Sequence, residues 1–387
     1  MAYRLRLDHV AFLRSPDGVA ALVQAAGLEL TATSRLRDVA TARVLAGERG
    51  PAVLETALLR RQAVGKLDDP QRWLLTDDAL QQATASAVAA HRAQRLVGRA
   101  VHDVTCSIGA ELVELASVTT ALLGSDLDPV RLAMAAHNAP GVTLVRADAL
   151  VPVSRDAVVL ADPGRRSDDR RTHDPARLQP PLPELLSVHS GRDIVVKCAP
   201  GIDVDRLGWR GEVEVVSLDG GVREACLWSP GLSGAATRRA TVLTSSGRGW
   251  TITDRDPDDA AVREPGEWII NPDGAVVRAG LVRHWAARHG LGQLDHRIAY
   301  LTGDTVPAGV RGFRVLGHGR FSEKSLRQEL ARLDCGSAEI LTRGADVDPA
   351  VLRPRLRLRG TRALSVVLTR IGDTPTAFVC TATPRGW

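Results

Sequence analysis

The sequence predicts an α/β fold: a parallel sheet preceded by a helical N-terminal domain and followed by an α+β C-terminal module. Two patterns predict this arrangement. From Gly98 onward, short apolar runs alternate with helical stretches, as in parallel sheets built from strand–helix–strand units. Before Gly98, apolar residues recur at three- and four-residue spacings, for example in residues 51–67 and 77–96. We therefore expect a helical domain over residues 1–97.

The central domain is expected over residues 98–232. Because ligands bind at the carboxyl ends of parallel strands, the residues that end its strands are candidates for a site. The last segment, EVEVVSLDGGVREACLW (212–228), has two alternating runs about a glycine pair, which predicts an antiparallel hairpin. A parallel sheet finished by such a hairpin is the outline of a Rossmann-like class I methyltransferase core. The expected strands are 98–106, 119–126, 142–148, 156–163 and 192–198, and the expected helices are 110–118 and 129–139.

Two further segments complete the predicted organisation. Residues 233–308 are expected to form a β-rich connector, in which residues 238–253 are mostly strand and residues 276–290 are helical. Residues 309–387 then follow the order strand, helix, strand, helix, strand, strand. This order predicts a small α+β module of the ferredoxin-like kind.

Composition excludes several classes of protein. Of the 387 residues, 44% are hydrophobic and 25% are charged, which is typical of a folded globular chain. The N-terminal residues MAYRLRLDHVAFLRS lack a long apolar run and no segment approaches the ~20 apolar residues of a membrane span, so we expect a cytoplasmic protein. The five cysteines are scattered singly, and His173, His189 and His318 have no partner at ligand spacing. We expect no metal site.

The stretch DVTCSIGAELVELA (103–116) lies where a nucleotide-binding loop is expected. A dinucleotide fingerprint needs G-x-G-x-x-G, but these positions hold Ser107, Gly109 and Leu112. Glu111, in the first helical turn, would repel a pyrophosphate, which argues against a NAD-dependent dehydrogenase. It would not repel S-adenosylmethionine, whose sulfonium and ammonium groups are cationic. We therefore expect a cofactor of this kind here, with Gly109 allowing close approach of its methionyl part.

Acidic residues end four successive predicted strands. We expect Asp103 near the methionyl amine, Asp126 on the ribose hydroxyls, Asp148 near the adenine amino group and Asp162 at the edge where the methyl group is delivered. Structural alternatives remain for the first three. Asp103 could orient its own loop, Asp126 could cap the following helix, although Asp128 suits that role better, and Asp148 could form a turn.

The loop residues Cys106 and Ser107 are also candidates for contact with the cofactor. Their alternative role is packing within the loop.

With these motifs in place, residues 103–230 resemble class I S-adenosylmethionine-dependent methyltransferases. The whole chain resembles the bacterial THUMP-like-domain methyltransferases, through the combination of DVTCSIGAE, GSDLDP, ADPGRR, VVKCAPGID, DGGVREACLW and TRGADVDPAVLRPRLRLRGTRALSVVLTR. The resemblance implies S-adenosylmethionine as cofactor. THUMP domains proper bind tRNA ends, so it also implies, by analogy, a structured RNA such as tRNA or rRNA as substrate.

The fourth motif, ADPGRR, bears on the atom that is methylated. Related amino-methylating enzymes use an (Asp/Asn)-Pro-Pro-aromatic motif, and this chain keeps Asp162 and Pro163, which we expect to be catalytic. Arg165 and Arg166 stand where the aromatic ring would be. Arginine can stack on a base or bind a phosphate, so both are candidates for substrate binding. They could equally begin a solvated loop.

Two more sets of residues are candidates for contact with RNA. Lys197 follows the fifth strand, and the adjacent Cys198 could be a nucleophile for carbon methylation or simply a buried apolar residue. Arg355, Arg357 and Arg359 lie in the most basic segment, RPRLRLRGTR, and could neutralise phosphates or form a solvated helix face. Two other hypotheses remain: a small-molecule or protein methyltransferase, and a non-catalytic RNA-binding protein with this fold.

Overall fold

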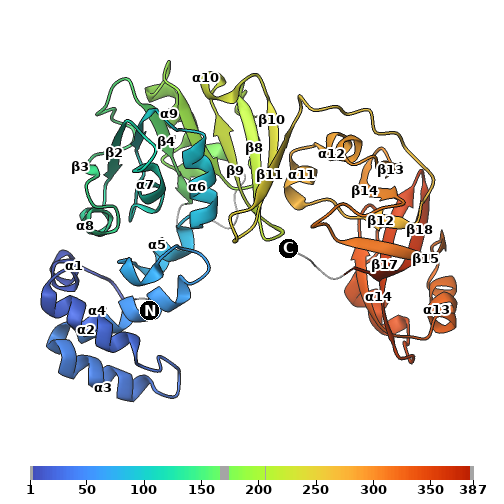
Figure 1. Cartoon of the computed structure of the whole chain (residues 1–387), viewed down its shortest axis with the longest axis horizontal. Helices are drawn as coiled ribbons and strands as arrows, with labels where there is room; N and C mark the ends of the chain where they lie inside the picture. The colour runs from blue at the N-terminus through green and yellow to red at the C-terminus, as the bar shows by residue number, and fades with distance from the viewer. Residues whose placement is uncertain (1–2, 166–173, 205, 384–387) are drawn as a thin grey trace. The chain divides into compact units, whose positions relative to one another are not determined.

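The computed structural model describes residues 3–165, 174–204 and 206–383, with the backbone alone of Arg165. The chain separates into two compact units, which are described individually (Figure 1). The first unit comprises Met1–Gly211, Glu224–Gly234 and Ser245–Gly247, and the second comprises Glu212–Arg223, Ala235–Thr244 and Arg248–Trp387. Within the described ranges, no helix is long and apolar enough to cross a membrane.

The first unit begins with six helices. Ser15 and Thr76 cap two of them, each with a hydroxyl that accepts a backbone N–H. The pattern over residues 77–96 predicts one helix, but the chain breaks at Ala83, whose backbone is extended, because Thr84 turns inward and its hydroxyl bonds Glu111. The helices are α1 (Leu7–Leu13), α2 (Pro16–Ala26), α3 (Arg35–Ala46), α4 (Gly50–Gln62), α5 (Asp77–Gln82) and α6 (Ser86–Gln94).

A parallel sheet forms the centre of the first unit. Its strand order is β9-β7-β4-β1-β2-β3, and all neighbours are parallel except β9, which is antiparallel to β7. The chain runs outward from β1 through β2 and β3, then continues on the other side with β4, so the order reverses beside β1. Ligands bind at such a reversal. The strands are β1 (Ala100–Asp103), β2 (Ala121–Asp126), β3 (Thr143–Arg146), β4 (Val158–Ala161), β7 (Ile194–Cys198) and β9 (Gly221–Trp228).

Burial explains the composition of these strands. Every residue of β4 and of β7 is buried, as expected for strands covered on both faces. The remaining elements pack around them or connect them: α7 (Ala110–Leu115), α8 (Pro129–Asn138), α9 (Leu182–Val188), α10 (Pro230–Ser233) and the short pair β5 (Gly164–Arg165) and β6 (Leu178–Gln179). The predicted class I methyltransferase core is confirmed in this sheet.

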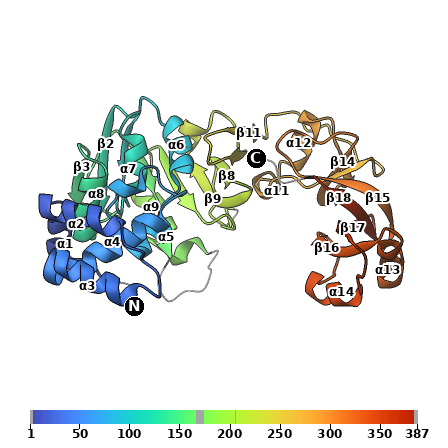
Figure 2. The same cartoon turned by 60° about the horizontal axis from the view of Figure 1, so that its bottom comes forward.

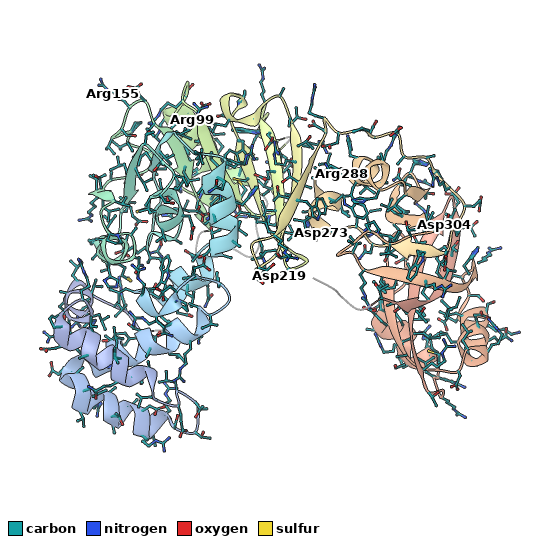
Figure 3. The ribbon with its side chains drawn as sticks, in the orientation of Figure 1. Arg99, Arg155, Asp219, Asp273, Arg288 and Asp304 are labelled. Carbon is teal, nitrogen blue, oxygen red and sulfur yellow. The ribbon has the colours of Figure 1, made fainter. Side chains whose placement is uncertain are left out.

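The second unit contains two groups of strands. In the first group, β11 (Gly249–Thr253), β10 (Arg238–Leu243) and β8 (Glu212–Leu218) are neighbours in that order. Helices α11 (Gly274–Arg278) and α12 (Val282–Arg288) follow. Figure 3 labels Asp273, whose carboxylate caps α11, and Arg288, which forms an ion pair with Asp256 at 2.7 Å.

The second group is a seven-stranded sheet that contains the C-terminal α+β module. Leucines of α13 and α14 pack on one face of this sheet, where the two helices lie in Figure 2. The expected order of strands and helices is confirmed. In spatial order the sheet is β13 (Gly292–Asp295), β14 (Ile298–Gly303), β12 (Trp268–Ile270), β15 (Gly312–Arg320), β18 (Thr374–Ala382), β17 (Arg362–Ile371) and β16 (Cys335–Thr342), with α13 (Glu323–Arg332) and α14 (Pro349–Arg355).

Candidate functional site

A cavity of about 630 Å³ opens at the carboxyl ends of β1, β2 and β4 in the first unit. This volume lies in the ~300–1,000 Å³ range of pockets for small ligands and cofactors. The five acids expected from the sequence all line it: Asp103, Glu111, Asp126, Asp148 and Asp162. Cys106, Ser107 and Lys197 line it too. Strand ends that are far apart in the sequence thus converge on one space.

Asp126 holds the nucleotide-binding loop in place. Its Oδ2 accepts the backbone N–H of Ser107 at 3.0 Å, and its Oδ1 accepts that of Asp128 at 2.8 Å. Asp128, rather than Asp126, caps α8, with its Oδ1 accepting from the backbone of Val130 at 2.7 Å. Because each carboxylate oxygen can accept more than one hydrogen bond, Asp126 keeps capacity to bind a ligand.

Gly109 is the N-cap residue of α7 and has a left-handed backbone conformation. Its φ is +86°, and a Cβ there would lie 3.4 Å from Cα of Ala135 in α8. The positive φ, which residues with side chains rarely adopt, favours glycine at this position, and Gly109 is not among the lining residues of the cavity. Pro163, buried next to Asp162, is also outside this lining, which Gly164 enters.

Asp103 and Asp148 differ in burial. Asp103 is 2% exposed, its Oδ1 accepts the backbone N–H of Thr105 at 3.1 Å, and burial together with the nearby charge of Glu111 raises its pKa to about 7. Asp148 is exposed, and its Oδ1 accepts the backbone N–H of Leu150 at 2.9 Å, so it does form a turn. Burial thus favours the neutral form of the Asp103 carboxyl group.

Glu111 belongs to a buried chain of charges. Its Oε2 lies 2.5 Å from Nη1 of Arg92 and its Oε1 lies 3.2 Å from Nζ of Lys197. Lys197 in turn lies 2.5 Å from Oδ2 of Asp162, and Arg92 also pairs with Glu224. Burial opposes ionisation of Glu111, but Arg92 and Lys197 outweigh it and lower the pKa of Glu111 to about 2. The sequence indicated an uncompensated carboxylate, whereas two cations offset its charge.

Lys197 and Cys198 face opposite ways on β7, as neighbours on a strand do. Lys197 enters the cavity lining, whereas Cys198 is buried outside that lining and burial raises the pKa of its thiol well above the usual value. A raised pKa disfavours the thiolate that a nucleophile needs. The geometry therefore argues against covalent catalysis by Cys198. Burial raises the pKa of the Cys106 thiol as well.

The structure describes only some of the arginines that we expect to bind substrate. The side chain of Arg165 and the whole of Arg166 lie outside the part of the chain that the structure describes. Arg355 is at the end of α14 in the second unit, where its Nη1 donates to Glu323 at 2.9 Å. Arg357 and Arg359 follow in the next loop and are exposed.

Sequence reasoning missed the residues that the N-terminal helical region contributes to the lining of the cavity. Gln82 and Thr84, at and after the end of α5, line the cavity, and Arg92 of α6 reaches Glu111 from the same side. One signal was available: Arg92 repeats at helical spacing with Val88 and Ala89, all three of which are buried, so it is an arginine on an apolar face. Apolar lining residues of the cavity were also missed: Leu127, Ala149, Leu150, Pro180 and Pro181.

The fold and the cavity define a class of protein. Three features are those of a class I methyltransferase: a parallel sheet whose order reverses beside β1, an antiparallel strand next to β7, and a small-ligand cavity lined with acids at the strand ends. Among the residues that the structure describes, no group of three or more histidines, cysteines or acids could hold a metal ion.

Comparisons with known proteins agree with this class. The chain is 57% identical over 351 residues to an uncharacterized S-adenosylmethionine-dependent methyltransferase of Mycobacterium tuberculosis, recorded from strains CDC 1551 and H37Rv, covering 86% of this chain and 98% of the relative. The chain belongs to the S-adenosylmethionine-dependent methyltransferases. Residues 310–382 match the family model described as THUMP domain-like.

A solved structure supports the fold. A crystal structure from Porphyromonas gingivalis W83 that carries a methyltransferase assignment is similar to this chain with a TM-score of 0.72 and 18% sequence identity, covering 95% of this chain and 98% of the other. The protein is thus an S-adenosylmethionine-dependent methyltransferase with a C-terminal THUMP-like domain.

Proposed function

We propose that the protein methylates structured RNA, tRNA or rRNA, at a group held by Asp162. The THUMP-like domain carries the choice of RNA, and the placement of Asp162 carries its role in holding the methylated group. Its backbone N–H donates to Oγ1 of Thr105 at 2.7 Å, its Oδ2 is paired with Lys197, and its side chain is 41% exposed at the cavity. A carboxylate fixed in this way is suited to orient a substrate.

The residues present fit S-adenosylmethionine. When bound, this cofactor supplies a methyl group on a cationic sulfur. Asp126 would accept the ribose hydroxyls, Asp148 the adenine amino group and Asp103 the methionyl ammonium group, so that acceptors of the cavity meet donors of the cofactor. Leu127, Ala149 and Leu150 would contact the adenine faces. Cys106 and Ser107 would line the methionyl end, and Gly109 would allow close approach of that end through the conformation of the loop.

The chemistry of Asp162 restricts the kinds of group that the protein could methylate. An ionised carboxylate accepts hydrogen bonds and does not donate them, so the group it orients carries an N–H or O–H. Asp162 would accept that hydrogen as the methyl group is transferred, and Pro163 would set the backbone that follows. Carbon methylation by a thiolate adduct is disfavoured because Cys198 is buried outside the cavity lining.

The THUMP-like domain supports RNA as the substrate. Arg357 and Arg359 are exposed in this domain and would neutralise phosphates, and Arg355 would join them when it releases Glu323. In this proposal, residues 1–97 contribute residues to the lining of the cavity, and residues 98–232 bind the cofactor. Residues 233–308 connect that domain to residues 309–387, which bind RNA. Arg165 and Arg166 would contact the substrate beside Asp162.

Transfer of labelled methyl groups tests the proposal. Purified protein is incubated with methyl-labelled S-adenosylmethionine and total RNA from a strain that lacks the gene. We expect label in tRNA or rRNA, and much less label with an Asp126→Ala variant when the cofactor is supplied near the wild-type Kd. Label in protein or small-molecule fractions alone would instead support a protein or small-molecule methyltransferase. Mass spectrometry of the nucleosides then identifies the methylated atom.

A further inference from the structure

We propose that Lys197 is a positioning residue of the reaction: its ammonium group holds the carboxylate of Asp162 at the cavity, and the buried pair of Glu111 and Arg92 holds Lys197. This inference rests on the proposed role of Asp162. It assigns Lys197 a place behind the catalytic carboxylate, rather than a direct contact with RNA.

The burial of Lys197 is the first argument. Its side chain is 7% exposed, and an ammonium group removed from water keeps its charge only when it is paired. Nζ lies 2.5 Å from Oδ2 of Asp162 and 3.2 Å from Oε1 of Glu111. Two acids that line the cavity therefore share one cation, and Asp162 is the more exposed of the two, with a side chain that is 41% exposed against 7% for Glu111.

The fixation of Asp162 is the second argument. Its backbone N–H donates to Thr105 and its Oδ2 accepts from Lys197. Both the backbone and the carboxylate at the tip of the short side chain are therefore restrained. In the part of the chain that the structure describes, its Oδ1 has no hydrogen-bond partner and remains available to a substrate. A catalytic group must be held within ~0.5 Å of its productive position, and Lys197 supplies the restraint.

The support behind Lys197 is the third argument. Glu111 receives Arg92 from α6 on one oxygen and Lys197 on the other, and the hydroxyl of Thr84 bonds Glu111 as well. Helix α6 is thus linked to Asp162 through three successive ion pairs: Arg92–Glu111, Glu111–Lys197 and Lys197–Asp162. The charged groups that face Lys197 come from five elements or their ends: Asp162 after β4, Glu111 of α7, Arg92 of α6, Glu224 of β9 and Asp103 of β1.

Lysine titration tests this arrangement without any RNA. The chain has three lysines, Lys66, Lys197 and Lys324, so protein labelled with ¹³C at the lysine Cε gives three resonances, and Lys197→Met identifies one of them. The Lys197 resonance should show no titration up to the ordinary lysine pKa of ~10.4. Asp162→Asn should lower its titration midpoint by about 1–3 units, because an opposite charge within ~4–6 Å is lost.

Asp128→Asn is the matched control for this titration. Asp128→Asn keeps the helix cap, since asparagine caps as well as aspartate, and should leave the Lys197 resonance unchanged. A Lys197 that titrates at or below ~10.4 in the wild type, or that ignores Asp162→Asn, would overturn the inference. If Lys197→Met does not fold, Lys66→Arg and Lys324→Arg identify the other two resonances, and the third belongs to Lys197.

Kinetic measurements test the role of Lys197 in the reaction. Once the RNA substrate is known, Lys197→Met should lower kcat by about 10²-fold, the loss typical of a displaced catalytic group, with the Kd of the cofactor little changed. Lys197→Arg, which keeps the charge, should recover part of kcat. An unchanged kcat in Lys197→Met contradicts the positioning role. Failure of the RNA assignment alone leaves the titration result unaffected, so the two proposals fail separately.

Discussion

Arg92 of α6 and Glu111 of α7 form a buried ion pair, with Nη1 of the guanidinium 2.5 Å from Oε2 of the carboxylate. Their side chains are 2% and 7% exposed, and the second guanidinium nitrogen pairs with Glu224. A buried pair contributes little relative to apolar residues, but removal of one partner leaves an uncompensated charge. The pair therefore ties the N-terminal helices to the cofactor loop.

Arg92→Met should destabilise the first unit strongly. The loss of one guanidinium leaves Glu111 and Glu224 buried with less compensation, which costs about 3–5 kcal/mol in comparable cases. Thermal unfolding followed by calorimetry measures the effect. The control is Arg155→Met, an exposed arginine of the same unit labelled in Figure 3, which should change stability by less than about 0.5 kcal/mol. Equal stability of the two variants would show that the pair is not formed.

Asp126→Ala should weaken binding of S-adenosylmethionine and of its demethylated product alike. The carboxylate holds the Ser107 amide, and in our proposal it also binds the ribose, so its loss should cost about 10–100-fold in Kd, the effect of one or two charged hydrogen bonds. Isothermal titration calorimetry gives both constants. Asp128→Asn should bind normally, and an unaltered Kd in Asp126→Ala would rule out the ribose contact.

Cofactor binding should depend on pH through Asp103. Burial and the charge of Glu111 raise the pKa of Asp103 to about 7, so the group is partly protonated below neutral pH. A methionyl ammonium group favours the ionised form. Binding should therefore release a proton, and affinity should rise as pH rises from 6 to about 7.5.

Calorimetry in buffers of different ionisation enthalpy measures this proton release. Asp103→Asn cannot ionise and should abolish both the release and the rise in affinity. Proton uptake by the wild type, or an affinity that does not change over this interval, would place the ammonium group elsewhere.

The double variant Arg357→Ala/Arg359→Ala should weaken RNA binding without changing cofactor binding. Each lost phosphate contact should reduce the slope of log K against log salt by about one. Filter binding over a range of salt concentrations measures the slope. The matched control is Arg314→Ala, because Arg314 is paired with Glu267 at 2.7 Å. An unchanged slope in the double variant would exclude these two arginines from the RNA surface.

The strand-end acids could be predicted from the sequence because local pattern is sufficient to locate them. Strands alternating with helices must form a parallel sheet, and their last residues then share one edge, so Asp103, Asp126 and Asp162 meet at the cavity. The THUMP-like module was likewise recognised from a continuous segment.

The charge network could not be predicted in the same way. Arg92 and Glu224 are 132 residues apart, and their pairing depends on how α6 packs beside β9, which no local pattern specifies. The break after α5 was missed for a related reason, because the inward turn of Thr84 is a tertiary contact that overrides helical periodicity. The sequence also does not distinguish a glycine that is needed for a positive φ, as at Gly109, from a glycine that a cofactor approaches closely.

A crystal structure with the demethylated cofactor bound tests the central claim most directly. We predict the ribose hydroxyls on the carboxylate of Asp126, the amino group of the methionyl part beside Asp103, and the sulfur facing Asp162. A cofactor found outside this cavity, or Asp126 turned away from the ribose, would contradict the account.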